Sequence, residues 1–219
     1  TSHEYVLFFS NLGRVYRLKA YQVPEGSRTS KGLNIVNLLP LTENESITAM
    51  LHVPSMEEEL NLCMLTKKGI IKRTLLSAYN TARKGGIIAI DLDEDDELCF
   101  TALTSGSDEL IIATKKGMAI RFKETDARLL GRTARGVRAI NLSDEKDDSV
   151  IGCAVVEEGK ALLTVTETGF GRVSEFDNYR LQSRGGKGLI NYHTEKFGDV
   201  AAVAAISGDE DAILISAGG

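Results

Sequence analysis

The chain carries a short pattern five times at intervals of about fifty residues, and this repetition restricts the folds that are open to it. Each copy consists of Ser or Thr, two variable residues and Gly. The copies are SNLG (10–13), TKKG (66–69), TKKG (114–117), TETG (166–169) and SAGG (216–219). Their glycines lie 56, 48, 52 and 50 residues apart. This near-constant spacing indicates that one structural unit has been duplicated.

Short apolar runs flank the copies and predict strands. Such runs precede the first four copies at 5–9, 61–65, 109–113 and 161–165, and others follow the first three at 14–18, 70–74 and 118–122. Glycine adopts the positive φ that a tight turn requires, so each copy predicts a β-hairpin.

Three further features recur in order after each hairpin. A basic loop ending in Gly leads into a strand at 31–38, 85–92, 135–142 and 187–194. An acidic turn follows at 43–45, 93–97, 144–148 and 195–199, and then a final apolar run at 47–53, 98–104, 150–156 and 200–206. Each unit therefore has roughly four strands, and no helix is predicted anywhere.

The repeat predicts an all-β fold built from about four to five four-stranded units, at roughly 1–46, 47–97, 98–148 and 149–199 with a partial unit at 200–219. A single sheet of this size cannot cover both of its faces. The units must therefore stack, either radially as propeller blades or as a solenoid. The chain has no Trp, so the Trp-Asp signature of one common propeller repeat is absent.

Composition excludes several classes of protein. With 219 residues, 42 % of them hydrophobic, the chain can bury a core without disulfides or metal. Lys and Arg number 26 against 31 Asp and Glu, which excludes a uniformly basic surface. Cys63, Cys99 and Cys153 stand singly in apolar runs, which predicts buried free thiols in a reducing cytoplasm. The longest apolar run, 200–206, is too short for a membrane span, and nothing at the start of the chain resembles a signal peptide. We expect the chain to be a piece of a longer polypeptide.

Basic residues recur at two phases of the repeat. The basic loops hold Arg28 and Lys31, Arg83 and Lys84, Arg132 and Arg135, and Arg184 and Lys187. A second set follows the hairpin glycines by three or four residues: Arg17, Lys72, Arg73, Arg121 and Arg172. Rotation would place equivalent loops on one rim, so these cations predict a track that grips a polyanion by its phosphates, with the acidic turns elsewhere. Glycine would let backbone N–H groups approach the oxygens. The alternative is that the cations only confer solubility and block edge-to-edge pairing.

Enzymatic alternatives find little support. A P-loop requires Gly-Lys followed by Ser or Thr and a helix, whereas Gly188 and a strand follow Lys187. His3, His52 and His193 have neither metal-ligand spacing nor a paired nucleophile. Tyr21, Tyr79 and Tyr179 recur eight or ten residues after their glycines, which predicts packing between units rather than catalysis. The sequence offers no catalytic residue, metal ligand or cofactor site.

At its most specific points the chain resembles the C-terminal domain of bacterial DNA gyrase A. QSRGGKG (182–188) is similar to the seven-residue box of that family, with Ser183 where Arg is usual. The stretch 7–41 is similar to the family's second blade, and SRTSKG (27–32), TARKGG (81–86) and GRTARG (131–136) resemble degenerate boxes. The likeness covers essentially the whole chain.

The resemblance implies a β-pinwheel, a propeller-like disc whose blades exchange strands. It implies a non-catalytic domain that bends and wraps double-stranded DNA around its outer edge with little sequence specificity. The parent type IIA topoisomerase then introduces negative supercoils with ATP, using a tyrosine and an ATPase site outside this chain. Implied partners are the rest of gyrase A, together with gyrase B, in an A2B2 enzyme in the bacterial cytoplasm at the nucleoid, with no cofactor bound here.

We expect DNA contacts at the cations named above and at the box residues Gln182, Arg184, Gly185, Gly186, Lys187 and Gly188. Two alternatives stay open. One is the equivalent domain of topoisomerase IV, whose boxes are more eroded. The other, from a different class, is a propeller-like scaffold whose basic loops bind acidic proteins.

Overall fold

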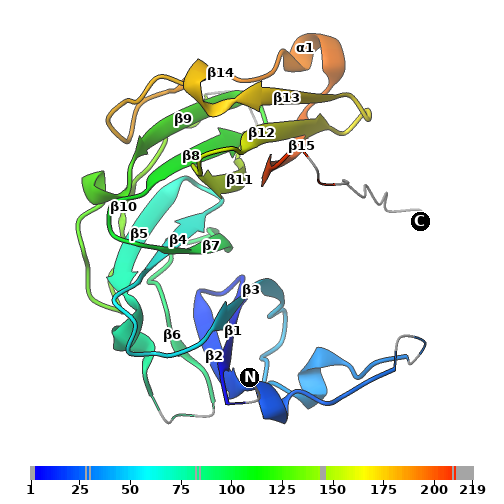
Figure 1. The fold of residues 1–219 in the computed structure, drawn as a ribbon, viewed down its shortest axis with the longest axis vertical. Coiled ribbons are helices and arrows are strands. Elements are labelled where there is room, and N and C mark those ends of the chain that lie inside the picture. The colour runs from blue at the N-terminus through cyan, green and yellow to red at the C-terminus, as the bar shows by residue number, and fades with distance from the viewer. Residues whose placement is uncertain are drawn as a thin grey trace.

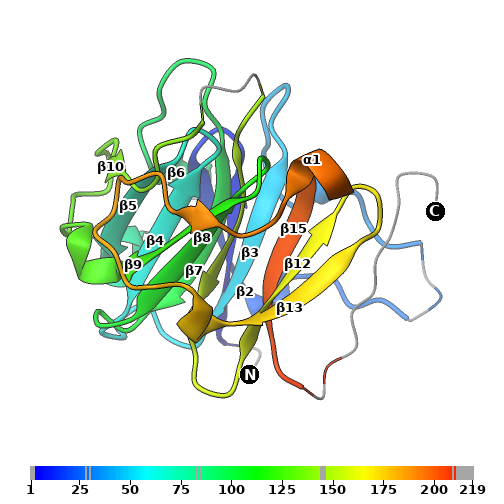
Figure 2. The same cartoon turned by 90° about the horizontal axis from the view of Figure 1, so that it is seen from above.

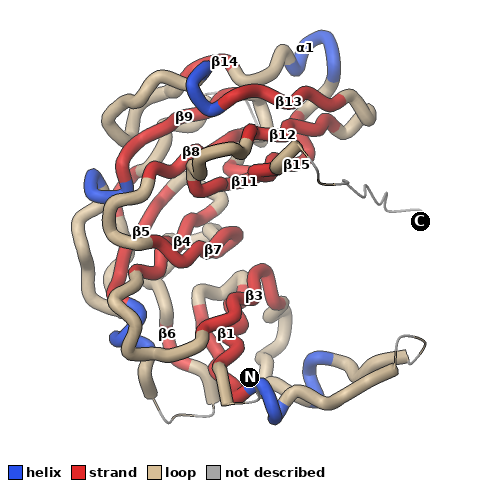
Figure 3. The backbone as a smooth tube through the Cα atoms, viewed as in Figure 1, coloured by secondary structure: helices blue, strands red, loops and turns tan. Residues whose placement is uncertain are grey.

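Four antiparallel sheets stand side by side along an open arc (Figure 1). This computed structural model describes residues 3–27, 29, 31–81, 83, 85–143, 147–208 and 210. Seen from above, the strands of successive sheets run in roughly the same direction (Figure 2). The tube in Figure 3 consists of strands and loops with only short helices. The predicted all-β, propeller-like architecture is confirmed, whereas the bounds predicted for the repeats stay a prediction.

The four sheets, named A to D here, share one plan. From the concave to the convex side of the arc, sheet A contains β3 (Ile47–Val53), β1 (Tyr5–Ser10), β2 (Arg14–Lys19) and β6 (Ile87–Ile88). Sheet B contains β7 (Leu98–Thr104), β4 (Asn61–Thr66), β5 (Ile70–Leu75) and β10 (Val137–Arg138). Sheet C contains β11 (Val150–Val155), β8 (Glu109–Thr114), β9 (Met118–Lys123) and β14 (Leu189–Ile190). Sheet D contains β15 (Val200–Ile206), β12 (Ala161–Thr166) and β13 (Gly171–Glu175).

The outermost strand of a sheet comes from the next unit along the chain. After β4 and β5 of sheet B, the chain returns to sheet A, where β6 pairs with β2, before it forms β7 in sheet B. Likewise β10 pairs with β5 and β14 pairs with β9. Each of these strands is only two residues long, so most of the strands predicted at 85–92, 135–142 and 187–194 are loop.

The recurring tetrapeptide forms the hairpin turn for a chemical reason. At the second copy, the Gly69 N–H donates to the Thr66 carbonyl at 3.0 Å, and the Ile70 N–H donates to the Thr66 hydroxyl at 3.1 Å. The same two bonds recur at the turns that begin at Ser10, Thr114 and Thr166. The glycine has φ of +81° at Gly69, which explains the Gly at the fourth position, while the hydroxyl explains the Ser or Thr at the first. The fifth copy, SAGG, lies outside the described residues.

The core lies between neighbouring sheets. Leu7 and Phe9 of sheet A pack with Leu62 and Met64 of sheet B, and equivalent clusters fill the spaces between B and C and between C and D. The three cysteines are free thiols. Cys63 is buried, Cys99 and Cys153 are partly buried, and burial raises the pKa of Cys63 and of Cys99 to about 12. Thiols of this kind are inert near neutral pH.

Short helices are the elements that the sequence did not predict. The 3₁₀ helices are η1 (Ala20–Gln22), η2 (Ile35–Asn37), η3 (Leu76–Tyr79), η4 (Glu124–Asp126) and η5 (Phe176–Asn178), and the α-helix is α1 (Thr194–Phe197). Three or four residues are too few for a helical hydrophobic period. No helix in the described ranges is long and apolar enough to cross a membrane.

The packing role predicted for the recurring tyrosines holds for two of the three. Tyr79 and Tyr179 are buried against the core. The prediction is wrong for Tyr21, which is 62 % exposed, because no sheet lies on that side of sheet A in the described chain.

Candidate nucleic-acid interface

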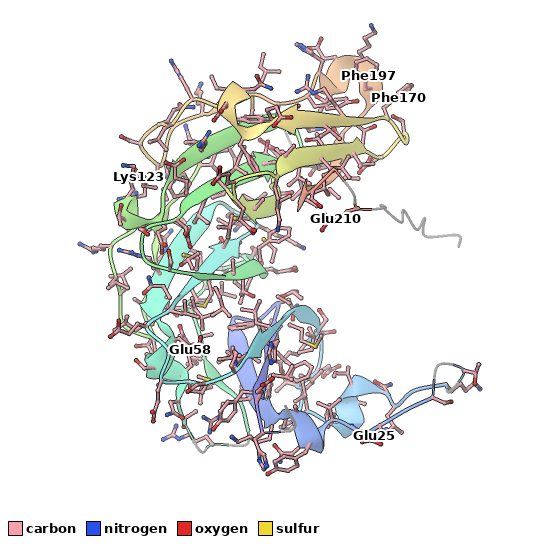
Figure 4. All side chains as sticks on the ribbon, viewed as in Figure 1. Glu25, Glu58, Lys123, Phe170, Phe197 and Glu210 are labelled. Carbon is pink, nitrogen blue, oxygen red and sulfur yellow. The ribbon has the colours of Figure 1, made fainter. Side chains whose placement is uncertain are left out.

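The loops that precede β6, β10 and β14 lie on the convex edge of the arc, which we call the rim (Figure 1). We call them the box loops: 81–86, 131–136 and 182–188. Because each leads into the outermost strand of the preceding sheet, the chain itself brings equivalent loops to the same edge. The described residues of the fourth candidate loop, 27, 29, 31 and 32, belong to a segment that extends away from the arc near Glu25 (Figure 4).

The glycines of QSRGGKG let its backbone lie directly on the preceding sheets. The Gly185 N–H donates to the Ala139 carbonyl at 2.6 Å, and the Gly186 carbonyl accepts from the Asn141 N–H at 2.8 Å. Gly185 and Gly188 have φ of +82° and +79°, and a Cβ on Gly188 would lie 2.3 Å from the Ala119 carbonyl oxygen. These glycines therefore serve close approach of backbone to backbone. Gln182 is partly buried, and its N–H donates to the Arg121 carbonyl at 2.9 Å.

Arg132 and Arg184 make the same contact in successive units. The Nη1 of Arg132 donates to the Ile88 carbonyl at 2.7 Å, and the Nη1 of Arg184 donates to the Arg138 carbonyl at 2.9 Å. Ile88 and Arg138 are the second residues of β6 and β10. Arg132 and Arg184 thus each tie their loop to the rim strand of the preceding sheet, and each guanidinium has further N–H groups left for a ligand.

Three of the predicted cations are exposed side chains: Lys31, Arg83 and Lys187. None of these side chains has a hydrogen bond or ion pair with the described part of the chain. They are consequently available to an external anion. Arg28 and Lys84 lie outside the described residues.

The guanidinium groups of the strand arginines Arg17, Arg73 and Arg121 bind the next unit of the protein and are not free at the surface. Arg73 Nε donates to the carbonyl of Ala127, which follows η4, at 2.8 Å. Arg121 Nη1 donates to the Phe176 carbonyl of η5 at 2.8 Å, and Arg17 Nη1 donates to the side chain of Asn80, which follows η3, at 2.6 Å. This recurring contact joins sheets A, B and C each to the 3₁₀ helix of the following unit or to the residue after it.

Three more predicted residues, Lys72, Arg135 and Arg172, are also bound within the protein itself. Lys72 is fully buried, so the surface position predicted for it is wrong, and Arg73 is only 8 % exposed. Arg172 donates to the Asn191 carbonyl and lies 5.6 Å from the Tyr192 ring centre. Arg135 forms a bidentate ion pair with Asp93, and this pair holds the pKa of the Asp93 carboxyl below its usual range. The separation of acidic turns from basic loops is therefore incomplete.

Several exposed cations are absent from the predicted contacts, among them Lys123, Arg128, Arg138 and Arg180. Arg138 lies in β10 on the rim, and Lys123 projects outward from the convex side of the arc (Figure 4). Arg128 and Arg180 each follow a 3₁₀ helix and are 52 residues apart, the same interval as Arg132 and Arg184. The repeat phase was the signal that could have found this pair.

Most of the acidic turns lie against the hairpin tips, away from the box loops. Lys67 pairs with Glu97 at 2.6 Å, and Lys115 and Lys116 pair with Asp199 at 3.6 and 3.0 Å. Asp96 and Asp148 accept backbone N–H bonds from the hairpin residues Lys68 and Lys116. Cations at the tips are thereby neutralised, which leaves the rim as the basic part of the described surface. No group of three His, Cys, Asp or Glu in the described ranges could hold a metal ion.

Replacing Arg121 by Met should lower the free energy of unfolding by about 2 kcal/mol, because the Phe176 and Tyr179 carbonyls and the Glu109 carboxylate, 2.7 Å from Nε, lose a charged donor. Urea titration followed by circular dichroism measures this change. Lys123→Met is the matched control, since Lys123 lies on the same strand and is exposed. Equal stabilities of the two variants would contradict the joining role of Arg121.

Comparison with known proteins places these features in a family. The family model described as "DNA gyrase C-terminal domain, beta-propeller" matches residues 4–54, 60–103, 108–157 and 160–207. The chain is 44 % identical to the DNA gyrase A protein of Haloquadratum walsbyi, over 98 % of this chain and 26 % of that protein. It is 43 % identical to the DNA gyrase A protein of Staphylococcus epidermidis, over 100 % of this chain and 25 % of that protein. The chain thus spans about a quarter of the length of these relatives.

Solved structures agree with the fold. A structure of the DNA gyrase A C-terminal domain matches with a TM-score of 0.78 and 27 % identity, covering 95 % of this chain and 68 % of that one. The crystal structure of the C-terminal domain of DNA topoisomerase IV matches with a TM-score of 0.71 and 19 % identity, covering 95 % and 81 %. At 19 % identity, the second match shows the fold alone.

Proposed function

Because the chain belongs to the DNA gyrase C-terminal domain family, we propose that it binds and bends duplex DNA along its rim, as a non-catalytic part of a gyrase A protein. The observation that carries the proposal is the set of exposed cations that the box loops and rim strands bring to one convex edge. These are Arg83, Arg138 and Lys187, and Arg128 and Arg180 add two exposed cations in the segments that lead into the box loops 131–136 and 182–188.

The chemistry of this edge suits a phosphate backbone better than a base sequence. Lys and Arg neutralise phosphates, and such contacts fix a duplex in place without reading its bases. Arg132 and Arg184 would add guanidinium N–H groups that their carbonyl contacts leave free. Contacts spread along a convex edge favour a curved duplex over a straight one. Smooth bending of 20 to 30 base pairs costs roughly 1–6 kcal/mol, which several phosphate contacts can offset.

In the intact enzyme we assign this domain the role of presenting DNA for strand passage, so that ATP hydrolysis elsewhere can introduce negative supercoils. The remainder of gyrase A, together with gyrase B, would be its protein partners, in the cytoplasm at the nucleoid. A topoisomerase IV domain is the less favoured alternative, since the sequence is 44 % identical to a gyrase A protein and contains the near-complete QSRGGKG box. A scaffold for acidic proteins is the alternative from another class.

Titration of the protein against a linear duplex at several salt concentrations tests the proposal. We expect sequence-tolerant binding that weakens steeply with salt, by about 0.9 in log K per log unit of salt for each phosphate neutralised. Five such contacts would give a slope of about 4.5. The duplex ends should also approach each other on binding, as measured by energy transfer between end labels. Absence of binding at low salt would contradict the proposal and favour the scaffold.

A further inference from the structure

Lys72 is a fully buried cation that contacts two separate units. Its side chain is 0 % exposed, and its Nζ donates to the Ala89 carbonyl at 2.5 Å, to the Gly131 carbonyl at 3.1 Å and to the Arg132 carbonyl. Ala89 directly follows β6 of sheet A, whereas Gly131 and Arg132 belong to the next box loop. All three ammonium N–H groups are therefore used, and they join the loop 131–136 to the rim strand before it.

The neighbouring box loop achieves the same attachment without a lysine. There the Gly185 N–H bonds directly to the Ala139 carbonyl, and Ala139 directly follows β10 as Ala89 follows β6. When Gly136 is aligned with Gly188, the residue equivalent to Gly185 is Thr133. Gly185 has φ of +82°, a conformation that a β-branched residue such as Thr avoids. Within the described chain, no bond joins the Thr133 N–H to Ala89.

The position of Lys72 supports the underside of a box loop in every unit that has one. In sheet C the equivalent residue is Ile120, a methyl group of which would lie 3.7 Å from a Cβ placed on Gly186. In sheet A it is Tyr16, the ring of which would lie 2.5 Å from a Cβ on Gly86. An apolar residue thus suffices beneath the glycine-rich loop, whereas a long cation lies beneath the loop that contains Thr133.

We infer that Lys72 is a positioning residue for DNA binding, because it holds the loop 131–136 on the rim where the glycine found in QSRGGKG is missing. This rests on the proposed function. Lys72 itself never reaches the duplex, and it acts through Arg132, the carbonyl of which it binds. Burial lowers the pKa of Lys72 to about 8, and the charge of Arg132 adds to this effect while Asp91 opposes it. The ammonium keeps its proton at pH 7 and can donate all three bonds.

Lys72→Ile, which copies the residue at position 120, tests the inference. We expect amide hydrogen exchange in 131–136 to accelerate at least 10-fold without DNA, while 182–188 exchanges as before. Duplex affinity should fall about 5-fold, and the salt slope should drop by about 1, the loss of one phosphate contact. Lys72→Ile combined with Arg132→Ala should bind no more weakly than Arg132→Ala alone, because both changes remove the same contact.

The double variant Lys72→Ile with Thr133→Gly provides a rescue, because it recreates the Ile and Gly pair of the neighbouring loop. It should recover both slow exchange in 131–136 and duplex affinity. If Lys72→Ile alone fails to fold, the same two measurements on the double variant test the inference. Unchanged exchange in 131–136 in Lys72→Ile, or no recovery in the double variant, would overturn the inference. The exchange measurement needs no DNA. If the wild-type protein did not bind duplex, the proposed function would be refuted, while the exchange data would still decide whether Lys72 anchors the loop.

Discussion

A variant with alanine in place of Arg83, Arg128, Arg138 and Lys187 should bind linear duplex DNA on the order of 100- to 1000-fold more weakly at physiological salt. These side chains are exposed, and none of them has a hydrogen bond or ion pair with the described part of the chain. Their removal therefore takes away phosphate contacts without breaking the fold. The salt slope should fall by about 3.6, which is four contacts at about 0.9 each. Fluorescence anisotropy of a labelled duplex over a range of salt concentrations measures both quantities.

The matched control removes four positive charges from the hairpin tips. Lys67, Lys68, Lys115 and Lys116, each changed to alanine, give the same net charge as the rim variant, but three of them pair with Glu97 or Asp199 and Lys68 binds the Glu94 carbonyl. We expect this variant to keep nearly the wild-type slope. If both variants lost affinity equally, overall charge would be responsible, and the rim would not be the binding edge.

Glu124→Ala should be among the most damaging single changes to stability, lowering the free energy of unfolding by about 3–5 kcal/mol. Glu124 is 0 % exposed and accepts from the N–H groups of Gly106 and Asp108 at 2.7 and 2.9 Å and from the Thr104 hydroxyl at 2.7 Å. Arg73 lies 3.6 Å away. Alanine would leave these donors and the arginine without their acceptor. The thermal midpoint should fall by about 10 °C, as scanning calorimetry would measure.

Asp126→Ala provides the comparison for Glu124, since this exposed carboxylate ends the same 3₁₀ helix. Its loss should change stability by no more than about 0.5 kcal/mol. A Glu124 variant as stable as the Asp126 variant would show that the buried carboxylate gains no more from its donors than it loses by leaving water.

The hairpins and inner strands followed from local sequence, because both the Ser or Thr hydroxyl and the Gly φ act within five residues of chain. The sheet that each of β6, β10 and β14 joins could not be predicted in this way. Two residues such as Ile87 and Ile88 carry no periodic signal, and their partner strand β2 lies some seventy residues earlier in the chain. The resemblance to a strand-exchanging family predicted this exchange where the residue pattern alone could not.

The charged residues show the same division between local and distant information. Repeat phase identified Arg132 and Arg184 as equivalent, and they do make equivalent contacts. Phase alone could not show that Arg121 binds η5, because its acceptors lie more than fifty residues later. Nor could it pair Arg135 with Asp93, 42 residues earlier. Recurrence therefore indicates that a residue has a shared role, and only the packing of neighbouring units shows whether that role is structural or lies at the surface.

The exchange of rim strands has a mechanical consequence. A stiff duplex held in a curve pushes back on its support, and that load falls on the outermost strands. Since β10 is covalently continuous with the unit after the sheet it completes, a force that would slide two units apart is carried partly along peptide bonds and not only across side-chain contacts. The arc can therefore resist the recoil of a strained polymer without a larger core.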